Sequence, residues 1–349
     1  MSDARQGPAA SVLDWLLDPE DPPVRYQALR SLVGLPLDHR EVVRARRAVL
    51  DWPPVQSILH QQNADGSWRD PEAPYQPTYT ASFWTLMLLA YVGLDRSDER
   101  IVRAVEHVFR FQRPDGGFAM AGDVGANWHY EAAVKWNTAR GRPAPARDAH
   151  VQDYLRQSTF SCLTGNLVAA LWRLGFGEDE RTRRAVDWLV EIQNVDGGWL
   201  CPYWRPHARD KHGCFMGTIC ALEGMSEIPG ARRPHAVSAG IERGVEFLLL
   251  HRLYRADHHN WKVIDERWLT LGFPRYYRYD ILRGAWVLRR LGIRDGRMTD
   301  ALNVLREKRQ PDGRWLLEVP PRGRLSAQLG TKGRPSKWVT WMALEALTE

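Results

Sequence analysis

The chain has 349 residues, of which 44% are hydrophobic, so it is long and apolar enough to form one large domain or two ordinary ones. Its formal net charge is +6, but Arg alternates with Asp and Glu along the sequence, as in GEDERTRRAVDW (177–188). This pattern is typical of solvated helix faces and argues against a nucleic acid partner. The longest apolar run, TLMLLAYVGL (85–94), is too short to span a bilayer.

The N-terminal residues 1–23 lack the basic stretch, apolar core and small-residue cleavage site of a secretory signal. The four cysteines are few for this length and argue for reduced thiols rather than a disulfide framework. We therefore expect a soluble, cytoplasmic protein without a transmembrane segment.

One short phrase recurs along the chain, as QNADGSW (62–68), QRPDGGF (112–118), QNVDGGW (193–199) and RQPDGRW (309–315). Before each copy, apolar residues fall at three- and four-residue spacing, which predicts a helix with one solvated face. These amphipathic segments are 40–62, 98–112, 179–193 and 300–310. The Asp-Gly pair then ends the helix, because Gly accepts the left-handed conformation of a tight turn. The Gln is expected to cap the helix end.

A much more apolar helix is predicted after each turn and at one further place in the chain. These helices are predicted at 79–93, 160–175, 214–225, 279–292 and 337–347. A helix that is apolar on most sides must be buried, so the alternation predicts an inner layer and an outer layer of helices.

Closure into a ring is favoured over an open solenoid, because residues 21–34 supply a sixth inner helix and residues 9–17 complete the outer layer. We therefore predict an all-α protein, a single (α/α)6 toroid over residues 1–349. Residues 119–159 are atypical and form an insertion, either a lid or a surface segment.

The repeated phrases resemble the Q-x-x-D-G-x-W repeats of the squalene cyclase and protein prenyltransferase superfamily, over most of residues 55–347. The resemblance implies an α/α toroid in which these turns tie the helical layers together and do no chemistry. Trp68, Phe118, Trp199 and Trp315 are accordingly expected to be structural.

Every inner helix of such a toroid begins at the same end, so the residues there gather around one mouth. Cys162 and Cys214 lie at the starts of successive inner helices, and Cys201 lies in the loop before the second. Thiolates with imidazole are preferred ligands of Zn²⁺, and His207 and His212 occur in the same loop. We predict a Zn²⁺ site at Cys162, Cys201, Cys214 and His212, either structural or catalytic. The alternative is three ordinary core thiols.

The resemblance bears on this site as well. In protein prenyltransferase β subunits an Asp-x-Cys pair at the start of an inner helix binds catalytic zinc, and HGC (212–214) places Cys214 on that cysteine and His212 on that aspartate. The family's His ligand would fall near YYRYD (276–280), where this chain offers Tyr277 and Asp280 instead, so the match is partial.

Asp280 is a carboxylate at the beginning of an otherwise apolar inner helix, which makes it the candidate catalytic acid or base unless Arg278 or Arg283 pairs with it. The alternative is a carboxylate that interacts with the helix dipole. The Asp-x-Asp-Asp motif with which class II terpene cyclases of the superfamily protonate an alkene does not occur in this sequence. Only a lone acid such as Asp280 would support that reaction.

The predicted inner helices carry aromatic residues that either line an apolar cavity or pack as core: Phe83, Trp84, Trp172, Phe215, Trp286, Trp338 and Trp341. The leading hypothesis is an enzyme of the terpene cyclase and prenyltransferase superfamily that acts on an apolar, isoprenoid-like small molecule. The alternative is a non-catalytic binding or scaffold toroid with a structural metal or none. That alternative predicts a barrel filled along its axis.

Overall fold

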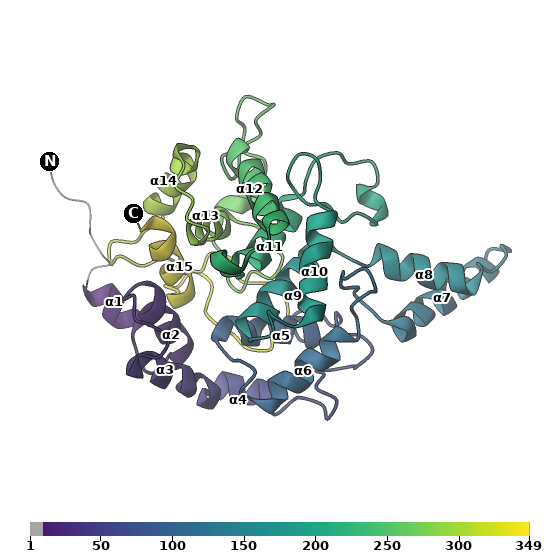
Figure 1. The fold of residues 1–349 in the computed structure, drawn as a ribbon, viewed down its shortest axis with the longest axis horizontal. Helices are drawn as coiled ribbons and strands as arrows, with labels where there is room; N and C mark the ends of the chain where they lie inside the picture. The colour runs from purple at the N-terminus through teal and green to yellow at the C-terminus, as the bar shows by residue number, and fades with distance from the viewer. Residues whose placement is uncertain (1–9, 349) are drawn as a thin grey trace.

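The computed structural model describes residues 10–348, and Figure 1 shows that these form an inner and an outer layer of helices. The inner helices are α2 (Pro22–Ser31), α5 (Ser82–Val92), α9 (Ser161–Arg173), α11 (Phe215–Ser226), α13 (Ile281–Arg290) and α15 (Lys337–Leu347). The outer helices are α1 (Ala10–Leu16), α3 (Arg40–Asp51), α4 (Pro53–Leu59), α6 (Glu99–Phe109), α10 (Glu180–Glu191), α12 (His235–Leu250) and α14 (Thr299–Glu307). The described residues contain no strand.

The inner helices close into a ring. Successive members from α5 to α15 pack against one another, and α15 packs against α2. The ring closes between α2 and α5, where Gln27 Nε2 donates to the carbonyl of Tyr91 at 3.3 Å. The two ends of the chain are joined by an ion pair of 3.0 Å between Lys337 Nζ and Asp18. The predicted all-α toroid is therefore confirmed.

Three of the four repeated turns fasten one outer helix to another. Gln112 Nε2 donates to the carbonyl of Gly116 in its own turn at 2.9 Å and to that of Arg181 in the first turn of α10 at 2.7 Å. Gln62 and Gln193 make the equivalent pairs of hydrogen bonds to α6 and α12. The Gln thus bridges two outer helices, and the expectation that it caps its own helix is wrong.

The last residue of each phrase fastens the outer layer to the inner one. Trp199 is fully buried, its backbone N–H donates to Thr218 Oγ1 on α11 at 2.9 Å, and its indole N–H donates to the carbonyl of Leu189 at 2.7 Å. Trp68 and Trp315 make the same two kinds of hydrogen bond, and the N–H of Phe118 donates to Thr164 on α9. These residues therefore have the structural role that was predicted.

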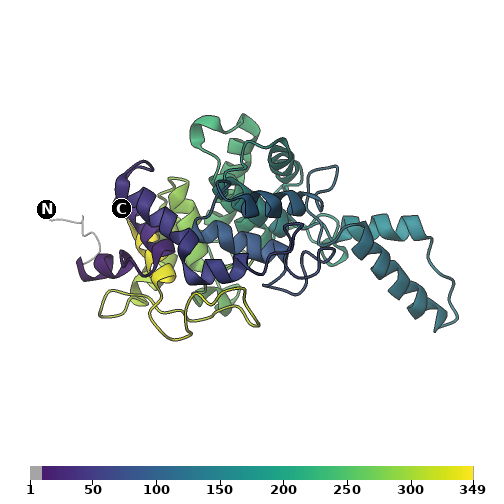
Figure 2. The ribbon, with the colours of Figure 1, turned by 90° about the horizontal axis from the view of Figure 1, so that it is seen from below.

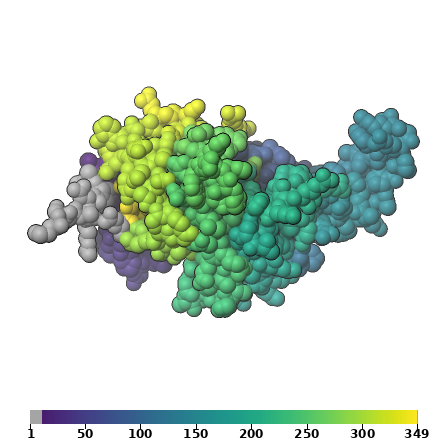
Figure 3. All heavy atoms as spheres, turned by 90° about the horizontal axis from the view of Figure 1, so that it is seen from above, coloured from purple at the N-terminus to yellow at the C-terminus, as the bar shows by residue number. Residues whose placement is uncertain are grey.

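Two segments depart from the predicted elements. The first outer segment breaks at Trp52 into α3 and α4, because Pro53 and Pro54 open a new helix. Residues 119–159 contain an antiparallel pair of helices, α7 (Asp123–Thr138) and α8 (Arg147–Gln157), which projects from the body as an arm (Figures 1, 2 and 3).

No helix within residues 10–348 is both long and apolar enough to cross a membrane. Residues 1–9, which form part of the stretch expected to lack a signal, lie outside the described residues.

The close contact of the turns with the outer helices predicts the effect of a single methyl group. Gly116 has a φ of +105°, and a Cβ there would lie 2.2 Å from the carbonyl oxygen of Arg184. The Gly116→Ala variant should therefore lose roughly 2–5 kcal/mol of unfolding free energy, the sum of left-handed strain and overpacking. Urea denaturation measures this loss.

Gly34→Ala is the matched control, because Gly34 has a φ of +80° and nothing lies within 4 Å of its Cβ position. It should lose only the strain, roughly 1–2 kcal/mol. Equal losses in the two variants would contradict the structural role of the turn.

Candidate functional site

Asp280 is placed as the N-cap of α13 and is completely buried. Its Oδ1 accepts from the backbone N–H of Arg283 at 2.7 Å, and its Oδ2 accepts from that of Gly272 at 3.1 Å. The charged partner is Arg275, at 3.7 Å, and not the side chain of Arg278 or Arg283. The carboxylate is thus held by backbone N–H groups and one buried Arg, which is the geometry of a residue that positions the segment before α13. A catalytic role for Asp280 stays a prediction.

The predicted zinc ligands are only partly brought together. Cys162, in the first turn of α9, lies close enough to Cys201 that their interaction, together with burial, raises the pKa of Cys162 well above its ordinary value. His212 points elsewhere: its side chain is 80% exposed and lies 3.8 Å from Asp196.

Within residues 10–348, no three His, Cys, Asp or Glu side chains are positioned to hold a metal ion. The side chains as placed therefore do not fit the expected zinc site, and we derive no chemical step through zinc. Zinc binding itself stays a prediction that elemental analysis tests.

His207, and not His212, is the histidine beside the thiols. The backbone N–H of Cys201 donates to its Nδ1 at 3.3 Å. The interaction with Cys162 lowers the pKa of Cys201, with a further contribution from His207, although burial opposes it. The Cys201 side chain in turn raises the pKa of His207. Cys220 has no exposed surface.

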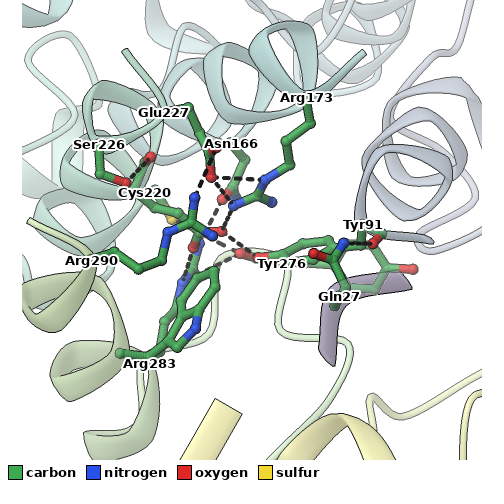
Figure 4. Close-up of polar contacts among 12 residues, drawn as sticks. Gln27, Tyr91, Asn166, Arg173, Cys220, Ser226, Glu227, Tyr276, Arg283 and Arg290 are labelled. Atoms are coloured by element: carbon green, nitrogen blue, oxygen red, sulfur yellow. Dashed lines mark hydrogen bonds and ion pairs between the residues drawn. The ribbon is translucent and has the colours of Figure 1, made fainter. Parts of the chain in front are cut away.

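A charged cluster occupies the axis of the ring (Figure 4). Glu223 of α11 is buried, and its two carboxylate oxygens accept from Arg173 of α9 at 2.6 Å and from Arg283 of α13 at 2.7 Å. The phenol of Tyr91 on α5 donates to the same carboxylate at 2.5 Å. Four inner helices are therefore joined through one side chain.

A second carboxylate extends the cluster toward the end of the ring. Glu227, just after α11, pairs with Arg173 at 2.7 Å and with Arg290 at 3.1 Å. Burial alone would raise the pKa of Glu223, but Arg283 and Arg173 hold it well below the ordinary range, so this carboxyl is ionised at neutral pH.

The segment between residues 271 and 280 fills the ring beside this cluster. Phe273 stacks on Trp338 of α15 with ring centroids 4.5 Å apart, and Tyr276 meets the ring of Trp84 on α5 at 5.1 Å. Tyr276 has a φ of +48°, and its carbonyl accepts from Arg283 at 2.6 Å, which holds this unfavourable conformation. A small cavity of about 10 Å³ lies beside the cluster, bordered by Tyr91, Asn166, Glu223 and Tyr276 among others.

Several polar atoms around this segment are buried without a hydrogen-bond partner among the described residues. They are Arg275 Nη1 and Nη2, Asn166 Nδ2 and Tyr276 Oη. A cavity of this size holds about one water, which would satisfy part of this set.

We expected the mouth of the ring at the N-terminal ends of the inner helices, and a pocket lies at the opposite, C-terminal end. Every inner helix, or the residue directly after it, contributes to a pocket of about 320 Å³. Its side chains include Tyr26, Arg30, Arg46, Tyr91, Trp172, Arg173, Glu227, Trp286, Arg290 and Trp341. Tyr91 and Arg173 also border the small cavity beside the cluster, so the pocket leads down to the charged cluster. A groove of about 490 Å³ on the outer surface shares only Trp172 with it.

Sequence reasoning missed Asn166, Arg173 and Glu223, and it named Arg283 only as a possible partner of Asp280. The signal was present, because each is a polar or charged residue within a helix whose other residues require burial. A buried helix tolerates such a residue when a partner of opposite charge is buried with it. The presence of Glu223 therefore predicts a buried arginine as its partner, and the buried arginines predict a buried carboxylate.

No model of a known protein family matches the chain, and no curated protein does. Among solved structures it is similar to the type II terpene cyclase MstE from Scytonema, with 17% identity and a TM-score of 0.45 over 95% of this chain and 88% of that one. A protein from Actinoplanes has 20% identity and a TM-score of 0.43 over 94% and 89%. An MstE variant in complex with merosterolic acid A has 17% identity and a TM-score of 0.46 over 97% of each chain. At such low values, the activity of the cyclase is not transferred to this chain.

Removal of the Glu223 carboxylate should lower the unfolding free energy strongly. The Glu223→Gln variant leaves two arginines at the ring axis without their shared anion and should lose roughly 3–5 kcal/mol of unfolding free energy. Glu246→Gln is the control, because Glu246 pairs with Arg297 but is 50% exposed, and it should lose less than about 1 kcal/mol. Urea denaturation of both variants at neutral pH measures the difference. Similar losses would contradict the central role of Glu223.

The loss of unfolding free energy at acidic pH should depend on the same carboxylate. Because the folded-state pKa of Glu223 lies below its unfolded value, its contribution to stability is present above the ordinary pKa of Glu and is lost as the pH falls below it. Between about pH 5 and about pH 3, the unfolding free energy of the wild type should therefore fall more steeply than that of Glu223→Gln. Parallel pH profiles would contradict this assignment.

Proposed function

We propose that this chain is an enzyme that acts on an isoprenoid-like small molecule with an anionic group, bound in the pocket at the C-terminal ends of the inner helices. The observation that supports it is the composition of this pocket, to which the whole inner ring contributes. At about 320 Å³ it lies within the size range of small-molecule sites. The resemblance of the repeated turns to those of the cyclase and prenyltransferase superfamily supports the same substrate class.

The charges of the pocket favour an anion. Four arginines border it and only one carboxylate, Glu227. Arg46 is paired with Asp95, and Arg173 and Arg290 share Glu227. Arg30 is exposed, lies over the ring of Tyr26 and has no ion pair with a carboxylate of residues 10–348. Planar guanidinium groups bind phosphate and carboxylate through paired hydrogen bonds.

The apolar walls favour a prenyl chain. Trp286 and Trp341 meet at 5.8 Å between ring centroids, and Trp172 and Tyr26 border the same pocket. When the C–O bond of an allylic diphosphate breaks, the electron pair leaves with the diphosphate and a carbocation remains. The arginines would stabilise the departing anion, and the faces of the indole rings would stabilise the cation. Transfer, elimination and cyclisation of the prenyl group all begin in this way.

The second candidate is a non-catalytic toroid that binds the same class of molecule. It is favoured by the packing of residues 271–280 inside the ring, where Phe273 stacks on Trp338 and Tyr276 meets Trp84. Farnesyl diphosphate distinguishes the two candidates, because an enzyme releases diphosphate and a prenyl product from it, whereas a binding protein returns it unchanged.

Binding should depend on both halves of the ligand. We expect farnesyl diphosphate to bind more tightly than farnesol. The Arg30→Ala substitution should weaken the binding of farnesyl diphosphate by about tenfold and change the affinity for farnesol little. Isothermal titration calorimetry measures both affinities. Arg40→Ala is the matched control, because Arg40 is 84% exposed on the neighbouring helix and does not border the pocket. Equal effects of the two substitutions, or no preference for the diphosphate, would overturn this proposal.

A further inference from the structure

A smaller pocket lies beside the N-terminal end of α5, at the opposite end of that helix from the pocket of about 320 Å³. Its volume is about 180 Å³, and we call it the loop pocket. It is bordered by the end of α4, the first repeated turn, the residues before α5 and the loop before α15. The two pockets have no lining residue in common. A ligand of the loop pocket would therefore bind independently of the proposed substrate.

The charged side chains of the loop pocket are all positive. Arg69 and Arg324 border it, and no acidic side chain does. Neither guanidinium group makes an ion pair or a hydrogen bond with any group of residues 10–348. Ser57 and Thr80 add hydroxyl groups to the same walls. The loop pocket thus offers positive charge and hydrogen-bond donors, and among its lining side chains it has no anion to pair with them.

The backbone beside the loop pocket adopts an unfavourable conformation at two places. Arg69 has a φ of +66° and Tyr79 has a φ of +71°, in the left-handed region that residues with a side chain rarely adopt. Asn63 Nδ2 donates to the carbonyl of Arg69 at 2.8 Å, and Ser326 Oγ donates to the carbonyl of Tyr79 at 3.1 Å. Such residues persist only where the surrounding structure holds them, and they are concentrated at binding sites. In this chain they place Arg69 and Ser326 on the walls of the loop pocket.

We propose that the loop pocket binds a phosphate or diphosphate anion between Arg69 of the first repeated turn and Arg324 of the loop before α15. Planar guanidinium groups bind phosphate oxygens through paired, charge-assisted hydrogen bonds. The volume of about 180 Å³ lies below the roughly 300–1,000 Å³ of sites that enclose a whole small molecule. The pocket therefore accepts a phosphate group rather than a prenyl chain. This phosphate is either free or the end of a larger molecule that extends into solvent.

A bound anion would join two parts of the chain that are far apart in the sequence. Ser326 already connects the loop before α15 to α5, because its Oγ lies 2.9 Å from Thr85 Oγ1. An anion would add a second connection, from Arg324 to the turn at Arg69, and would remove the repulsion between these two positive charges. Because the site exists only in the folded chain, the anion should also raise the unfolding temperature.

Isothermal titration calorimetry of the full-length protein with inorganic phosphate and with pyrophosphate, in chloride buffer of constant ionic strength, tests the proposal. We expect Arg69→Ala and Arg324→Ala each to weaken the binding of both anions by at least about tenfold. Arg322→Ala is the matched control, because Arg322 is exposed in the same loop and does not border the loop pocket. Without the anion, the variants should unfold at a temperature no lower than that of the wild type, so that a loss of binding is not a loss of folding.

Glycerol 3-phosphate distinguishes the two sources of the phosphate group. Binding that is weaker than that of inorganic phosphate would identify a free anion as the ligand. Binding that is equal or tighter would identify the phosphate end of a larger molecule. In both cases Arg69→Ala should reduce the affinity.

Three results would overturn the proposal. One is no binding of phosphate or pyrophosphate up to millimolar concentrations, and another is an equal loss of affinity in Arg322→Ala and Arg324→Ala. The third is binding that Arg30→Ala abolishes and Arg69→Ala leaves unchanged, which would place the anion in the pocket at the C-terminal ends of the inner helices. That result would leave the proposed function intact, so the two proposals can fail separately.

Discussion

The carboxylate of Glu223 is the constraint on which the inner ring depends. It lies where α5, α9, α11 and α13 converge, and it accepts hydrogen bonds from Tyr91, Arg173 and Arg283. A buried carboxylate and two buried guanidinium groups are each unfavourable alone, so the charges tolerate burial only in one mutual arrangement. This requirement sets the positions of the four helices relative to one another, which apolar packing alone specifies less sharply.

The repeated turns solve a different problem, the attachment of one layer to the other. The Gln side chains of the first three copies each bridge two outer helices, and each aromatic residue reaches from the outer layer to a hydroxyl group on an inner helix. These contacts are the same in successive units, whereas the charges on the axis occur once. The scaffold is therefore repetitive, and what is specific to this chain lies inside it and in the loops at its ends.

This division explains what the sequence predicted. The layers, the ring and the structural role of Trp199 could be predicted from local hydrophobic periodicity and from a turn sequence that occurs four times. The pocket at the C-terminal ends of the inner helices was not predicted, and neither was the packing of residues 271–280 inside the ring. The local sequence pattern of this segment predicts a loop and does not indicate that it packs against Trp84 and Trp338. The choice between His207 and His212 failed for a similar reason, since both lie in one loop and only its path decides which one meets Cys201.

The two ends of the ring are chemically different, and α9 contributes to both of them. It begins with Ser161 and Cys162 beside Cys201 and ends with Arg173 in the pocket. Its 13 residues separate these groups by about 20 Å at 1.5 Å per residue, so no direct contact joins them. Between them, Asn166 accepts from Arg283 at 2.8 Å, which ties the middle of the helix to the charged cluster. A change at the thiols would therefore reach the pocket only by moving a helix that Glu223 and its arginines hold in place, so the cluster that stabilises the ring also separates its two ends.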